Sequence, residues 1–284
     1  MSPAKPGNPD LPLVLWACLA EALAMTGFAA YPALLPELRQ AWQMSGTEAG
    51  LVGGAFFLGY MVAVPVLSGL TDRIDARRVF AASCALAACG SIGFGLLAHQ
   101  VATALLCQAL TGAGLAGTYM PGLKALTDRL QGVNQSRYVS YYTATFGVGA
   151  SISLLLAGWL NQALGWQMSF VILGLVPLLA IPIMLRCLAA QPVLHRAHTV
   201  RPPMRQIWAR REVRDYIIGY TVHCWELLGL RAWQVAFFSF AFGAGAVQAW
   251  LSPTEAAALL NLLGLPARIF GNELAMRLGR ARWI

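Results

Sequence analysis

Residues 45–49, Ser-Gly-Thr-Glu-Ala, return as residues 252–256, Ser-Pro-Thr-Glu-Ala, at an offset of 207 residues. The basic loop 72–78 returns as 276–282 at an offset of 204. Landmarks that keep nearly the same spacing indicate a duplicated unit. In each S-x-T-E copy, the serine and the glutamate three residues later fit a capping box, so each copy predicts the start of a helix.

The composition predicts an all-α integral membrane protein. Hydrophobic residues make up 58% of the chain, charged residues 11%, and the mean hydropathy is +0.60. A soluble domain carries roughly 25% charged residues, and a spanning helix needs about 20 mostly apolar residues. Such runs are too long for outer-membrane barrel strands, which alternate over about 10 residues. We expect eight spans, over about 12–34, 49–68, 79–98, 101–122, 139–160, 168–186, 216–242 and 254–272.

The net charge of +8 reflects membrane topology. With the N-terminus inside, 18 of the 20 Lys and Arg residues fall in the tail, in inner loops or at the inner end of a span, and only Arg39 and Arg231 do not. This asymmetry follows the positive-inside rule. We therefore expect a multi-pass protein of a bacterial-type inner (plasma) membrane with a cytoplasmic N-terminus. The bilayer accounts for the basic residues, so we expect no nucleic-acid partner.

The cysteines predict no cofactor. All six lie within or at the edge of predicted spans, and no two form a C-x-x-C pair. Neither a disulfide framework nor a zinc site is indicated. We expect neither a bound metal nor another cofactor.

The predicted organisation has four parts. Residues 1–11 are a cytoplasmic tail, 12–186 a six-helix bundle, 187–215 a basic cytoplasmic linker, and 216–284 the start of a second bundle. The first unit has six spans and its copy only two. We therefore expect a C-terminally truncated form, with spans 1–8 of 12, and little or no transport by these 284 residues alone.

This arrangement resembles the major facilitator superfamily. Its G-x-L-A-D-R-x-G-R-R element is similar to residues 68–78, in which Asp72, Arg73 and Arg77 match and Asp75 replaces a glycine. The resemblance implies a six-helix N-terminal bundle followed by two helices of an incomplete second bundle.

The resemblance also implies roles for particular side chains. Asp72, Arg73, Arg77 and Arg78 would form a charge latch that holds one conformation; the alternative is a solvated basic loop. In the fourth span, Gln108 stands where proton-coupled members have an arginine. That replacement argues against drug/proton antiport.

Four charged or His residues lie well inside predicted spans, away from their ends: Glu21 in the first, and His223, Glu226 and Arg231 in the seventh. A charge in the hydrocarbon costs on the order of 3 kcal/mol, so such residues usually face a cavity. In the family, these two spans line the central pathway. We expect Gln108 and these four residues to serve substrate binding or proton coupling, with Arg231 meeting an anionic group. The alternative is polar contact between helices without a ligand.

The expected function is secondary transport of a small solute by alternating access, with the proton as the simplest coupling ion. A non-transporting receptor or assembly protein of the same fold is the alternative. An enzyme is not expected, because His223 and Glu226 form a single H-x-x-E without further ligands. The sequence leaves the substrate open.

Overall fold

The computed structural model describes residues 10–130, 135–191, 204–245 and 250–278, and these residues form helices and turns without a strand. Part of the predicted tail and linker, and the end of the repeated basic loop, lie outside the described residues. The elements are α1 (Leu11–Ala24), η1 (Met25–Gly27), α2 (Ala30–Ala41), α3 (Gly46–Leu70), α4 (Ala76–Leu97), α5 (Val101–Ala116), α6 (Tyr119–Thr127), α7 (Gln135–Cys187), α8 (Met204–Ala209), α9 (Arg211–Gly243) and α10 (Pro253–Leu278).

The predicted membrane spans fall in helical stretches, but α9 and α10, which hold the two spans predicted over 216–242 and 254–272, are not among the described helices that meet the length and hydropathy of a membrane span. Among the described residues, five helical stretches are long and apolar enough to cross a membrane: Leu11–Ala41, Gly46–Leu70, Ala76–Leu97, Val101–Thr127 and Arg137–Cys187. The last holds two predicted spans, and its chain direction changes at Gly165, where φ is +81°. That left-handed conformation favours glycine. The all-α membrane fold is therefore confirmed.

Both predicted capping boxes are present. Ser45 Oγ accepts a hydrogen bond from Glu48 N at 3.2 Å, and Glu48 Oε2 accepts from Ser45 N at 2.9 Å. The corresponding distances between Ser252 and Glu255 are 3.3 and 2.8 Å. The two caps start α3 and α10. We name the end of the bundle that carries Ser45 the Ser45 end, and the opposite end the Asp75 end.

A break between α1 and α2 is bridged by α7. Ser153 Oγ accepts from Ala29 N at 2.9 Å and donates to Thr26 O at 2.6 Å. Backbone groups freed by a helix break must find partners, because lipid offers none. The serine supplies both and holds the first span against α7.

Glycines bring α3 and α5 into backbone contact. A Cβ at Gly59 would overlap the Ala109 carbonyl, and one at Gly112 would overlap the Phe56 carbonyl. Close approach through small residues is how helices associate in lipid. The contact fixes the part of α5 that carries Gln108.

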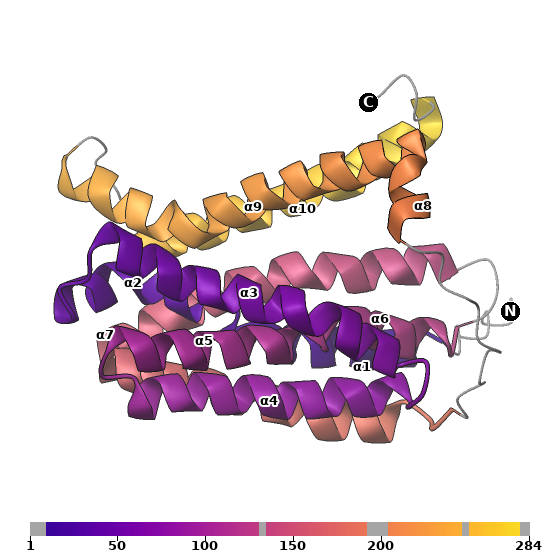
Figure 1. Ribbon diagram of the computed structural model, residues 1–284, viewed down its shortest axis with the longest axis horizontal. Coiled ribbons are helices and arrows are strands. Elements are labelled where there is room, and N and C mark those ends of the chain that lie inside the picture. The colour runs from indigo at the N-terminus through magenta and orange to yellow at the C-terminus, as the bar shows by residue number, and fades with distance from the viewer. Residues whose placement is uncertain (1–9, 131–134, 192–203, 246–249, 279–284) are drawn as a thin grey trace, which may run out of the picture.

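Helices α9 and α10 form a pair against one side of the first seven helices. They contact α7 and α2, and the only buried residues of α9 are Arg231, Gln234 and Val235. Figure 1 shows the pair approaching the bundle near α2 and diverging toward the Asp75 end. The α9–α10 pair and the bundle of α1 to α7 therefore touch over a short stretch nearer the Ser45 end.

Candidate functional site

A cavity of about 330 Å³ lies where α9 and α10 meet the bundle, and its walls come from α2, α3, α5, α7, α9 and α10. Much of the wall is aromatic: Phe28, Tyr31, Phe56, Phe57, Trp225 and Trp233. Trp225 is 80% exposed, so the cavity is open on that side. Mostly apolar walls with few polar groups are typical of small-molecule sites.

Arg231 supplies the positive charge of this cavity. Its side chain lines the wall and is buried, and its Cζ lies 5.1 Å from the ring centroid of Phe146 on α7. A guanidinium over an aromatic face gains a cation–π interaction, which grows as water is removed. The predicted cavity arginine thus lies in a cavity and joins α9 to α7.

Three amide side chains line the same cavity from different helices: Gln108 of α5, Gln234 of α9 and Asn261 of α10. Gln108 is 3% exposed and Gln234 4% exposed. Gln234 Oε1 has no hydrogen-bond partner among the described residues, whereas Asn261 Nδ2 donates to Ala257 O at 2.9 Å. Gln234 thus keeps an unused acceptor in the cavity that Arg231 also lines, and Gln108 adds a second buried amide there.

Glu21 lies inside the bundle, outside the cavity wall. Its side chain is fully buried on α1, and Tyr142 of α7 donates to its Oε2 at 2.9 Å. Its Oε1 has no hydrogen-bond partner among the described residues. Aromatic contacts connect the two sites, because Phe146 packs on Tyr119 at 5.4 Å and Tyr119 on Tyr142 at 6.1 Å between centroids.

His223 and Glu226 lie on an exposed part of α9 and do not line the cavity. Glu21 and Glu226, which hold equivalent positions in the two copies, therefore have different surroundings: one is buried and the other exposed. The structure brings Gln108 and Arg231 to one cavity but not the two glutamates. The roles of His223 and Glu226 stay predictions.

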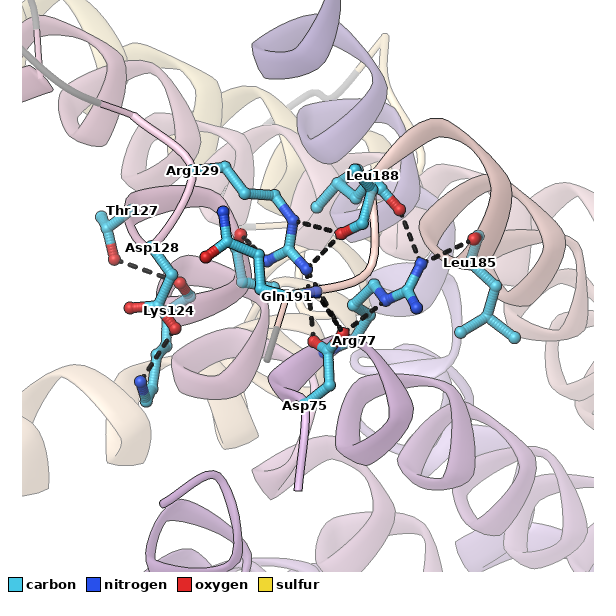
Figure 2. A network of polar contacts seen from close by, with 11 residues as sticks. Asp75, Arg77, Lys124, Thr127, Asp128, Arg129, Leu185, Leu188 and Gln191 are labelled. Carbon is cyan, nitrogen blue, oxygen red and sulfur yellow. Dashed lines mark hydrogen bonds and ion pairs between the residues drawn. The ribbon is translucent and has the colours of Figure 1, made fainter. Parts of the chain in front are cut away.

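The loop between α3 and α4 is organised around Asp75 (Figure 2). This carboxylate caps α4 by accepting from Arg77 N at 3.1 Å, and it pairs with Arg77 Nε at 2.7 Å and Arg129 Nη2 at 3.3 Å. It also accepts from Gln191 N at 3.3 Å. Burial alone raises the pKa of Asp75, but these hydrogen bonds and the charge of Arg129 outweigh burial and leave the pKa below its usual value.

The two arginines also hold the C-terminal end of α7. Arg77 Nη1 donates to Leu185 O at 2.9 Å and to Leu188 O at 2.7 Å, and Arg129 Nη2 donates to Ala189 O at 2.6 Å. Cations suit a helix C-terminus because its last carbonyls are unpaired and carry partial negative charge. The cluster thus joins the ends of α4, α6 and α7.

The sequence model of the Major Facilitator Superfamily matches residues 17–284 of this chain. The chain belongs to the Major Facilitator Superfamily. The predicted family is confirmed, and this membership together with the apolar helices makes the chain a multi-pass membrane protein of a transporter family.

Two curated superfamily transporters illustrate the likeness. The 3-(3-hydroxy-phenyl)propionate transporter of Escherichia coli (strain K12) is 28% identical over 198 residues, which cover 67% of this chain and 47% of that protein. The voltage-gated purine nucleotide uniporter SLC17A9 of Rattus norvegicus is 27% identical over 289 residues, covering 94% and 61%. The chain thus spans about half to three-fifths of the length of these relatives.

Solved structures share the superfamily fold. A bacterial homolog of the human lysosomal transporter Spinster, in an inward-facing and occupied conformation, aligns with a TM-score of 0.73 at 18% identity, covering 94% of this chain and 61% of that one. A peptide transporter POT in complex with sulfate aligns with a TM-score of 0.63 at 14% identity, covering 98% and 71%.

The four residues of the predicted latch differ in burial. Arg77 is buried in the Asp75 cluster, whereas Asp72, Arg73 and Arg78 are exposed. The latch itself stays a prediction. Asp75 stands where the family element has a glycine, and an aspartate directly before a helix is also a capping signal.

Two more residues of the sites, Gln234 and Arg129, are not among the predicted ones. Gln234 lies three positions after Arg231, a spacing that puts both on one helix face. Arg129 lies in a basic inner loop, and nothing in the sequence pairs it with Asp75. Tyr142 follows another tyrosine, and the sequence alone does not say which of the two faces inward.

Proposed function

We propose that this chain contributes the substrate site of a secondary transporter for a small organic anion that carries an aromatic ring. The observation that carries the proposal is Arg231, a buried cation in an aromatic-walled cavity between two groups of helices. A desolvated guanidinium is costly unless a partner compensates it. The Phe146 ring lies under this cation, and a bound carboxylate or phosphate would form charge-assisted hydrogen bonds with it.

The aromatic wall sets the second half of the substrate class. Phe28, Phe56 and Trp233 line the same cavity as Arg231. Aromatic rings gain from offset or edge-on packing against such rings. The substrates for which two relatives are named agree with this chemistry: a hydroxyphenyl propionate is an aromatic carboxylate, and a purine nucleotide carries an aromatic base and phosphate.

Alternating access is proposed from how the helices meet. Helices α9 and α10 contact the bundle over a short stretch, and the cavity lies at this junction. Rocking of one group of helices against the other around a fixed site would expose that site to each side in turn. The placement of 18 of 20 basic residues supports a cytoplasmic N-terminus in an inner membrane.

The proton is proposed as the coupling ion and Glu21 as its carrier. Glu21 is a fully buried carboxyl connected through Tyr142 and Tyr119 to Phe146, whose ring lies under the Arg231 guanidinium. A proton bound there would remove a negative charge that competes with an anionic substrate for Arg231. We expect Glu21→Gln to bind the substrate but to lose the effect of pH on its affinity.

Equilibrium binding of radiolabelled 3-phenylpropionate to the purified chain tests the substrate class. We expect saturable binding that unlabelled aromatic carboxylates displace and that a neutral amide of the same size does not. Equal displacement by the amide would refute an anion site. Counterflow of the same probe in proteoliposomes with a longer relative then tests transport, because we expect little or none from these 284 residues alone. A longer relative that binds the probe without moving it would favour the receptor alternative.

A further inference from the structure

The cavity carries two buried amides whose role the proposed anion site leaves open. We propose that Gln108 and Gln234 together recognise a neutral hydrogen-bonding group on the substrate, a hydroxyl or an amide on its ring. They would make the site selective for hydroxylated or amide-bearing aromatic anions. This inference rests on the proposed function, because it assumes that Arg231 holds the anionic end.

Burial is the first argument. Both side chains are at least 96% buried and line the cavity, and Gln234 Oε1 has no hydrogen-bond partner among the described residues. An amide in an apolar wall costs free energy unless its donors and acceptor are used. Two leucines would fill similar space without this cost. A ligand group that donates to one amide and accepts from the other would satisfy both.

The placement of the amides gives the second argument. Gln234 lies one helical turn after Arg231 on α9, so the two reach the cavity from one helix face. Gln108 reaches the same cavity from α5, whose position is fixed by the glycine contact with α3. A ring with an anionic group at one end and a hydroxyl at the other would thus contact α9 twice and α5 once.

The origin of the two amides adds a mechanical consequence. Gln108 belongs to the bundle and Gln234 to the α9–α10 pair, and the described contacts include no hydrogen bond between them. A hydroxyl held by both would join the two groups of helices. A ligand without this group would bind through Arg231 alone and form no such bridge. The two amide groups would then determine both the selectivity for hydroxylated ligands and the stability of the bridged arrangement of the two groups of helices.

Two probes that differ by one hydroxyl test the inference: 3-phenylpropionate and 3-(3-hydroxyphenyl)propionate. Their dissociation constants are measured on the purified chain, on Gln108→Leu, on Gln234→Leu and on Arg231→Gln. We expect the wild type to bind the hydroxylated probe about tenfold more tightly, as for one well-formed buried hydrogen bond. Each Gln→Leu variant should reduce this ratio to about two or less. Arg231→Gln should weaken both probes together.

The outcomes separate the two proposals. Equal affinities of the wild type for both probes, or a ratio unchanged in both Gln→Leu variants, would overturn the amide role and leave the anion site standing. No saturable binding of either probe by a folded wild type would overturn the proposed function as well. Thermal unfolding of each variant in detergent controls for folding. If the leucine variants do not fold, Gln108→Glu and Gln234→Glu are used instead. They keep the side-chain size, and their negative charge should weaken the binding of both anionic probes.

Discussion

The Tyr142 hydroxyl donates a hydrogen bond of 2.9 Å to Oε2 of Glu21 and so joins α7 to α1 inside the bundle. It is the only hydrogen bond to this carboxyl group from the described residues, and the other oxygen has none. The same hydroxyl lies 3.4 Å from the carbonyls of Thr118 and Tyr119, at the break between α5 and α6. Tyr142 therefore connects a buried acid with two interrupted spans.

Removing this hydroxyl should destabilise the bundle. Tyr142→Phe leaves a fully buried carboxyl group without its partner, and we expect a loss of about 1–3 kcal/mol in the free energy of unfolding. Denaturation in detergent measures it. Tyr141→Phe is the matched control, because the neighbouring ring is 49% exposed and should change stability by less than about 0.5 kcal/mol. Similar losses in both variants would contradict a specific role of Tyr142.

The Asp75 cluster predicts a larger effect. Asp75→Asn would leave the Arg77 and Arg129 side chains, 11% and 5% exposed, without their counter-ion. Breaking a buried pair from one side costs about 3–5 kcal/mol. Asp72→Asn, three residues earlier on the exposed part of the loop, should cost less than about 0.5 kcal/mol. A larger loss of unfolding free energy for Asp72→Asn than for Asp75→Asn would show that Asp72, and not Asp75, holds this loop in place.

The lowered pKa of Asp75 predicts an acid-dependent loss of stability. The folded state favours the charged form, so its contribution is fully present above the unfolded value of 3.8 and disappears as the pH falls through the lower folded pKa. Melting temperatures between about pH 6 and pH 3 should therefore fall more steeply for the wild type than for Asp75→Asn. Parallel curves would mean that Asp75 contributes no such linkage.

Two glycines of α3, Gly59 and Gly54, should respond differently to replacement by alanine. A Cβ at Gly59 would overlap the Ala109 carbonyl, whereas one at Gly54 meets nothing within 4 Å. Gly59→Ala should cost about 1–3 kcal/mol because α3 and α5 must separate. Gly54→Ala should stabilise the helix by about 0.5–1 kcal/mol. Thermal unfolding of the two variants gives the comparison, and a stabilised Gly59→Ala would rule out the tight contact.

The sequence predicted what depends on local chemistry and on the bilayer. Long apolar runs gave the spans, because lipid requires continuous hydrophobic helices. The capping boxes at Ser45 and Ser252 were predictable since their atoms lie within three residues of each other. Arg231 stood out because a charge in a span is rare. These signals need no knowledge of how helices rotate against one another.

Which face of each helix points inward could not be predicted. Glu21 and Glu226 occupy equivalent positions in the duplicated pattern, yet only Glu21 is buried, because α9 is covered only around Arg231 and Gln234. The ion pair between Asp75 and Arg129 joins residues 54 positions apart. Neither hydropathy nor spacing contains that long-range information.

The most direct measurement of the central claim is the affinity of 3-phenylpropionate for the wild type, Arg231→Gln and Arg211→Gln. Arg211 lies on the same helix, but its side chain is 86% exposed. We predict that Arg231→Gln weakens binding at least about tenfold, as expected for a charge-assisted hydrogen bond, and that Arg211→Gln leaves it unchanged. Wild-type affinity in a folded Arg231→Gln variant would contradict the assignment of this cavity as the substrate site.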